Sequence, residues 1–127
     1  MKARDIMAKA VQALASARIL LDSGDADGAC NRGYYAMCDA ARAALIVCGH
    51  DVGKTHKGLL NAFSEHLVKN GPLPKEMGRL LKQAEARRYV ADYEDEPVEL
   101  SDARDMVEQA GIFIAAMQSA FNLGARS

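Results

Sequence analysis

The chain of 127 residues contains no tryptophan, three prolines and three cysteines, and aromatic residues make up 6% of it. With 50% hydrophobic and 26% charged residues, this scarcity of proline excludes collagen-like and disordered chains. No run of about 18 uninterrupted apolar residues is present, so we expect no membrane span. Charged residues follow Met1 in place of the apolar core of a secretory signal. The length predicts a single domain over residues 1–127.

The three cysteines, Cys30, Cys38 and Cys48, are odd in number and form no Cys-x-x-Cys pair. A disulfide framework is therefore not expected, and we interpret all three as small core or half-buried residues of a cytoplasmic protein. Cys48 and His50 match no common zinc-ligand spacing. The sequence predicts no metal site and no cofactor.

Five segments carry apolar residues at three- and four-residue steps, and none shows the alternation of a strand. Short connections between amphipathic helices favour antiparallel neighbours, so the sequence predicts an all-α, up-and-down bundle. The expected helices cover about residues 6–23, 25–48, 55–70, 74–91 and 101–121. The residues expected at their ends are the stops Gly24 and Gly49, the N-caps Asp25 or Asp27, Thr55 and Ser101, and Pro74 as a first helical residue.

The net charge of −1 conceals two blocks of opposite sign. Residues 54–90 have a local net charge of +5, and residues 91–108 have one of −7. These blocks either solvate the helix faces and pair with each other, or form a surface for an anionic ligand beside an acidic segment. Total charge alone therefore does not exclude an anionic partner.

The second segment has two distinct faces at 100° per residue. Its apolar face is formed by Cys30, Tyr34, Met37, Ala41, Leu45 and Cys48, and its polar face by Arg32, Tyr35, Asp39 and Arg42. Asp39 stands three residues before Arg42, which is a spacing for an ion pair. The polar face is either an ordinary solvated surface or a seam that meets another helix, a ligand or a second subunit.

Arg88 aligns with the apolar residues of the fourth segment, so we expect its side chain to face the bundle. A guanidinium in that position needs a partner, and Asp92 and Asp39 are the candidates.

Gly53-Lys54-Thr55 lacks the first glycine and the preceding strand of a phosphate-binding loop. We interpret it as a turn in which Thr55 caps a helix. The start of that helix could still hold an anion weakly, through Lys54, Thr55, His56 and Lys57.

Three stretches together resemble the HEPN family (higher eukaryotes and prokaryotes nucleotide-binding) in its small prokaryotic branch. The resemblance covers roughly residues 3–121 and rests on Asn31-Arg-Gly-Tyr-Tyr-Ala-Met-Cys-Asp-Ala-Ala-Arg-Ala-Ala-Leu45, Thr55-His-Lys-Gly-Leu59 with Phe63, and Arg88-Tyr-Val-Ala-Asp-Tyr-Glu94. It implies an antiparallel four-helix bundle with an additional short helix, commonly dimeric. Many members are encoded beside a minimal nucleotidyltransferase and act in toxin–antitoxin pairs, and others are metal-independent ribonucleases.

The sequence departs from the ribonuclease branch, in which an Arg is followed by His after four to six residues. The nearest pair is Arg42 and His50, separated by seven residues with Gly49 between them. Asp39 also stands where relatives often have His, and Cys38 where they often have Phe. Without a suitably placed imidazole, general acid–base cleavage of RNA lacks its proton carrier.

Three hypotheses follow. The leading one is a non-catalytic HEPN bundle, a homodimer that partners a nucleotidyltransferase and binds a nucleotide or RNA. The second is a ribonuclease toxin that uses Arg42 or Arg88 with His50 or His56, and the third is a purely structural dimerisation module. The candidate polar site comprises Asn31, Arg32, Tyr35, Asp39, Arg42, Arg88 and Asp92.

Overall fold

The computed structural model describes residues 2–50, 55–93 and 97–124. Within these ranges every regular element is a helix, which confirms the all-α prediction. The elements in chain order are α1 (Lys2–Asp22), α2 (Ala26–Val47), α3 (His56–Ala62), η1 (Phe63–Lys69), α4 (Lys75–Tyr93) and α5 (Leu100–Ala120).

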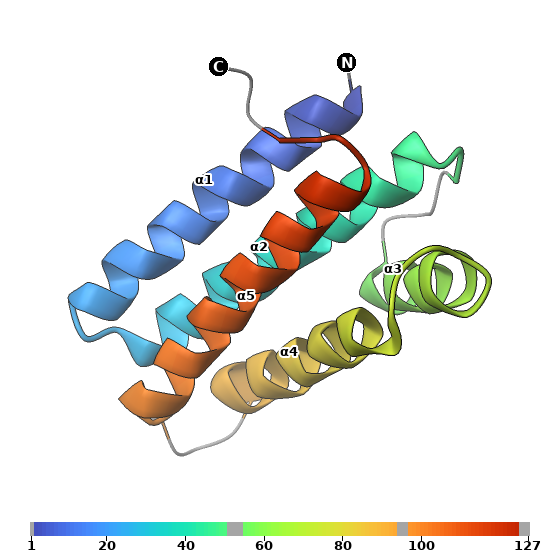
Figure 1. The fold of residues 1–127 in the computed structure, drawn as a ribbon. Coiled ribbons are helices and arrows are strands. Elements are labelled where there is room, and N and C mark those ends of the chain that lie inside the picture. Colours follow the sequence, from blue (N-terminus) through green and yellow to red (C-terminus); the bar gives the residue numbers. More distant parts are fainter. Residues whose placement is uncertain (1, 51–54, 94–96, 125–127) are drawn as a thin grey trace.

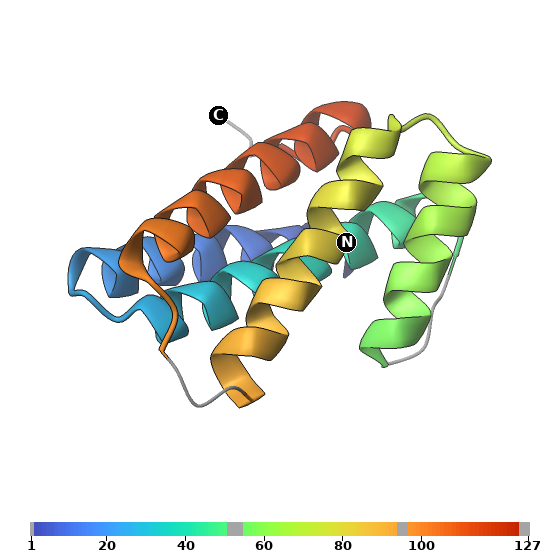
Figure 2. The same ribbon diagram turned by 90° about the horizontal axis from the view of Figure 1, so that it is seen from below.

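The four long helices alternate in direction and form the antiparallel bundle expected from the resemblance (Figure 1). α2 packs against α1, α4 and α5, while α1 and α4 lie on opposite sides of the α2–α5 pair. The additional short helix, α3 with its continuation η1, lies outside the four and contacts α2 and α4. Figure 2 shows that α3–η1 and α4 diverge from the loop that joins them, with α2 passing behind.

Helix ends follow local chemistry at several predicted positions. Gly24 and Gly49 both have positive φ, 88° and 86°, a conformation that a side chain disfavours, and each stops the helix before it. Asp25 is the N-cap of α2, since its Oδ1 accepts the Gly28 amide at 2.8 Å. Asp27 has a different role, because its Oδ1 accepts the backbone amide of Val98 at 3.0 Å.

The predicted start of the fifth helix was wrong. α5 begins at Leu100 with Glu99 as its N-cap, so Ser101 lies inside the first turn and caps nothing. Pro74 stands one residue before α4, and its carbonyl oxygen accepts the Met77 amide at 3.1 Å.

The third helix is also more complex than predicted. A single α-helix was expected over residues 55–70, but the chain changes from α3 to the π-helix η1 at Phe63. Its buried residues are nevertheless the expected ones, Leu59, Leu60, Phe63 and Leu67. Phe63 packs against Phe113 of α5, with ring centroids 5.5 Å apart, and so anchors this hairpin to the bundle.

Alanine dominates the buried face of α1 and α2, and it allows these helices to approach closely. At Gly33 of α2, an added Cβ would lie 3.7 Å from Met106 and 4.0 Å from Ala110, so α2 and α5 are also close. No charged or polar residue is buried among the described residues. Between α4 and α5, Arg87 forms an ion pair with Asp105 at 2.9 Å.

None of the described helices is both long enough and apolar enough to cross a bilayer.

Candidate functional site

Four side chains from three helices meet where α3 begins beside α2 and α4. The rings of Tyr34 and Tyr35 on α2 lie 5.6 Å apart, and the His56 ring of α3 is 5.3 Å from both. The guanidinium carbon of Arg88, on α4, lies 5.0 Å from the Tyr34 ring centroid, in cation–π geometry. This site, named here the ring site, places a cation, an imidazole and two aromatic faces together.

Arg88 faces the bundle as the sequence predicted. Its side chain is 16% exposed and donates from a terminal nitrogen to Asp92 Oδ2 at 3.1 Å. Of the two candidate partners, the structure thus pairs Arg88 with Asp92, one turn away on the same helix. A guanidinium carries five N–H donors, so this single contact leaves donors for a ligand.

The ring site contains buried polar atoms that the surrounding protein does not satisfy. The Tyr34 hydroxyl and Arg88 Nε are buried and have no hydrogen-bond partner among the described residues. Burial, with Cys38 next in effect, raises the pKa of Tyr34 far above its usual value of 10, so the phenol stays protonated. Such unsatisfied groups cost stability and are uncommon in native proteins, so their presence beside an imidazole makes the ring site a candidate functional site.

His56 is held in its neutral form near neutral pH. Burial lowers the pKa of His56 below its usual value of 6.5, and the positive charges of Arg88 and Arg42 lower it further, against a smaller opposing effect of Glu85. A neutral imidazole can accept a proton or a hydrogen bond. An anion bound between His56 and Arg88 would reverse this effect and raise the pKa.

The rest of the predicted polar face of α2 surrounds Asp39. This carboxyl is half-buried, and burial raises its pKa against the opposing charges of Arg42, Lys9 and Arg32. Arg42 therefore lies close enough to act on both Asp39 and His56. Arg32 is exposed and Asn31 is half-buried.

The residues predicted as anion contacts at the start of α3 have different roles in the structure. Thr55 Oγ1 accepts the Gly58 amide at 3.1 Å, which confirms the cap. His56 belongs to the ring site, whereas Lys57 is exposed. Lys54 lies outside the described residues. Anion binding at the start of α3 stays a prediction, and Thr55 already satisfies one of the amides there.

His50 lies apart from His56. Its ring stacks on that of His66 in η1, with centroids 4.0 Å apart and planes 14° apart. Of the two histidines named for the ribonuclease alternative, His56 shares the ring site with Arg88, and His50 stacks on His66 instead. The expectation of a half-buried Cys48 was wrong, because Cys48 is exposed at the end of α2, beyond the packed face.

Cys30 and Cys38 are buried, and burial raises their pKa values to about 11 and 12, so both thiols stay protonated. Within the described ranges no three His, Cys, Asp or Glu side chains converge as metal ligands would.

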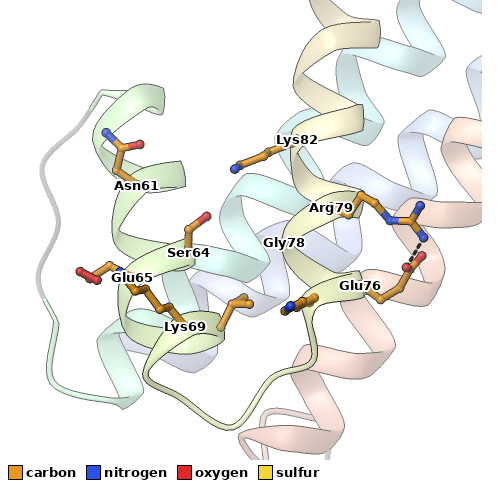
Figure 3. Close-up of a pocket in the computed structure, with 10 residues that line it drawn as sticks. Asn61, Ser64, Glu65, Lys69, Glu76, Gly78, Arg79 and Lys82 are labelled. Atoms are coloured by element: carbon orange, nitrogen blue, oxygen red, sulfur yellow. Dashed lines mark hydrogen bonds and ion pairs between the residues drawn. The ribbon is translucent and has the colours of Figure 1, made fainter.

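An open groove of about 890 Å³ lies between α3–η1 and α4. Figure 3 shows Asn61 and Ser64 on one wall and Lys82 on the other, while Arg79 turns aside to pair with Glu76. Four basic residues line the groove, Lys69, Lys75, Arg79 and Lys82, together with the two acids Glu65 and Glu76. The groove is thus lined by half of the eight basic residues in the positive block of the sequence.

Sequence reasoning missed one member of the ring site and one charged neighbour of it. Tyr34 was assigned to the apolar core and Glu85 was not singled out, although both act on the charged groups here. The hydroxyl of Tyr34 could have pointed to a polar role, because a buried tyrosine usually has a hydrogen-bond partner for its hydroxyl.

The sequence is similar to a known domain family and to several bacterial and archaeal proteins. The sequence model of the HEPN domain matches residues 3–120. A UPF0332 protein of Gloeobacter violaceus is 37% identical over 113 residues, which cover 87% of this chain and 89% of the relative. A UPF0332 protein of Thermotoga maritima is 32% identical over 112 residues, 87% of this chain and 83% of the relative. A Methanocaldococcus jannaschii protein, named as a candidate toxin, is 29% identical over 108 residues, 84% and 79% of the two chains.

Proposed function

The chain belongs to the HEPN domain family, and from this premise we propose that it is a phosphate-binding helical partner of a nucleotidyltransferase in a toxin–antitoxin-type pair. The toxin-type role is supported by the name of the Methanocaldococcus relative. The phosphate would belong to a nucleotide or to RNA, and Arg88 and His56 would hold it. The observation that carries the proposal is the convergence of these two side chains with Tyr34 and Tyr35 from three helices.

The chemistry of the ring site suits a phosphate monoester or diester. The Arg88 guanidinium offers planar donors in a fork that matches phosphate oxygens. Burial lowers the pKa of His56, and the positive charges of Arg88 and Arg42 lower it further. A phosphate beside the imidazole would offset these charges and favour its protonated form. Tyr35 is half-exposed and presents a ring edge on which a base could pack.

A thermal-unfolding experiment with AMP and adenosine tests the role of the phosphate. Any ligand at 100 times its dissociation constant stabilises the protein by about 2.7 kcal/mol. We expect AMP, or a short RNA, to raise the melting temperature more than adenosine does. Arg88→Met keeps the apolar stem over Tyr34 but removes the charge, and we expect it to weaken AMP binding by roughly tenfold or more, because a charged hydrogen bond contributes about 1.5–3 kcal/mol.

The matched control is Arg18→Met, which removes an exposed arginine from α1, away from the site. It should bind AMP as the unsubstituted protein does. A flat response of the unsubstituted protein to AMP, other nucleotides and RNA would overturn phosphate binding.

The partner is tested separately, by co-purification with a nucleotidyltransferase encoded beside it. Sedimentation of a clean monomer at tens of micromolar would exclude the homodimer that we also propose.

A second function, metal-independent cleavage of RNA, is favoured by the position of His56. A neutral imidazole beside an arginine could remove a proton from a ribose 2′-hydroxyl while Arg88 stabilises the phosphorane charge. Incubation with total RNA and EDTA decides between the two functions. Cleavage lost in both His56→Gln and Arg88→Met establishes the ribonuclease, whereas intact RNA supports the binding partner.

A further inference from the structure

The face of α4 that points away from the bundle carries basic and aromatic side chains in one line. At about 100° per residue, its members lie within a narrow sector of the helix surface. All are exposed, while Met77, Leu81 and Ala84 face the core. The line, named here the α4 outer face, consists of Lys75, Arg79, Lys82, Tyr89 and Tyr93.

The aromatic end of the α4 outer face is unusual for this chain. The Tyr89 and Tyr93 rings lie 4.9 Å apart, and the residues are 56% and 65% exposed. They are two of only four tyrosines in a sequence with no tryptophan. Two exposed rings side by side form a platform on which unpaired bases stack, whatever their identity.

The basic end of the α4 outer face adjoins the groove of Figure 3. Arg79 pairs with Glu76, but Lys69, Lys75 and Lys82 form no ion pair within the described part of the chain. Uncompensated cations beside a groove attract a polyanion and release its counterions on binding.

We propose that the α4 outer face and its lysine-lined groove bind single-stranded nucleic acid, with phosphates along the lysines and bases on the tyrosine pair. The proposal rests on the proposed function, because it extends phosphate binding from a single nucleotide to a strand; Arg88 itself faces the bundle, whereas Tyr89 and Tyr93 lie on the exposed face of α4. The line runs over the 19 residues of α4, which are 18 steps of 1.5 Å or about 27 Å. At about 3.4 Å per stacked nucleotide of one strand, this length corresponds to about eight nucleotides, far more than one nucleotide would need.

Fluorescence anisotropy with labelled eight-nucleotide RNA and DNA of the same sequence, beside AMP, tests the proposal. We expect at least one octamer to bind much more tightly than AMP. Tyr89→Ala with Tyr93→Ala should weaken octamer binding by roughly tenfold to a hundredfold, since each stacked base contributes about 1–3 kcal/mol. Lys75→Gln with Lys82→Gln should reduce the slope of log affinity against log salt by about 1.4, because each phosphate contact on a single strand contributes about 0.7.

The matched control is Lys2→Gln with Ile19→Ala, which removes an exposed cation and an exposed apolar side chain from α1. It should leave octamer binding unchanged. If AMP binds through Arg88 but the tyrosine variant binds the octamer normally, the α4 outer face is not a nucleic-acid surface, and the proposed function stands. If neither ligand binds, both proposals fail. If the tyrosine variant instead changes the sedimentation coefficient without affecting octamer binding, the face is a protein interface and the inference is overturned.

Discussion

The two sides of this molecule differ in the side chains that they carry. α1 and α2 meet largely through alanines, and α5 packs on them with larger apolar side chains that include Met106, Phe113 and Met117. α3–η1 and α4 diverge from each other and carry the ring site, the basic groove and the exposed tyrosine pair. The candidate ligand chemistry therefore lies where the second side meets α2, whereas the interior of the first side is filled by packed apolar side chains.

The largest effect should come from overpacking the alanine-rich side. Ala40 of α2 is fully buried, and Ala40→Leu should lower the free energy of unfolding by about 1–3 kcal/mol, since the added carbons have no space. The same substitution at Ala86, on the exposed side of α4, should change it by no more than about 0.5 kcal/mol. Urea denaturation of both variants measures the difference. Equal losses would show that the two sides are packed alike.

A smaller effect should follow acidification of the ring site. The folded-state pKa of His56 is lower than its unfolded value, so the folded state binds that proton less readily. The contribution of His56 to stability is thus full above about pH 6.5 and declines as the pH falls toward the lowered value. We expect His56→Asn to lose stability less steeply than the unsubstituted protein between about pH 7 and pH 5. Denaturation midpoints across this range measure it, and identical slopes would contradict the assignment.

Much of the fold could be read from the sequence because it depends on local signals. Gly24 and Gly49 stop helices through backbone conformation, and Thr55 caps a helix through one side-chain hydrogen bond. The apolar period correctly placed Leu59 and Phe63 in the core. Ser101 failed as a cap because α5 begins one residue earlier, at Leu100, and no residue pattern marked the change to a π-helix at Phe63.

The ring site was predictable only in part. Arg88 aligned with apolar residues of its own helix, so its direction followed from helical geometry, whereas the choice of Asp92 over Asp39 as its partner came from the structure. The contact of His56 with Tyr34 and Tyr35 did not, because it depends on where α3 docks along α2. That docking is set by tertiary packing between elements, which helical periodicity does not encode.

The central claim, that ligand chemistry belongs to the junction of α2, α3 and α4, is tested most directly by backbone amide NMR during titration with AMP and the octamer. The account predicts that AMP shifts the signals of residues 34–35, 56 and 85–92, that the octamer extends these changes toward Lys75, and that α1 stays unchanged. Shifts centred on α1 or α5, or none with either ligand, would contradict it.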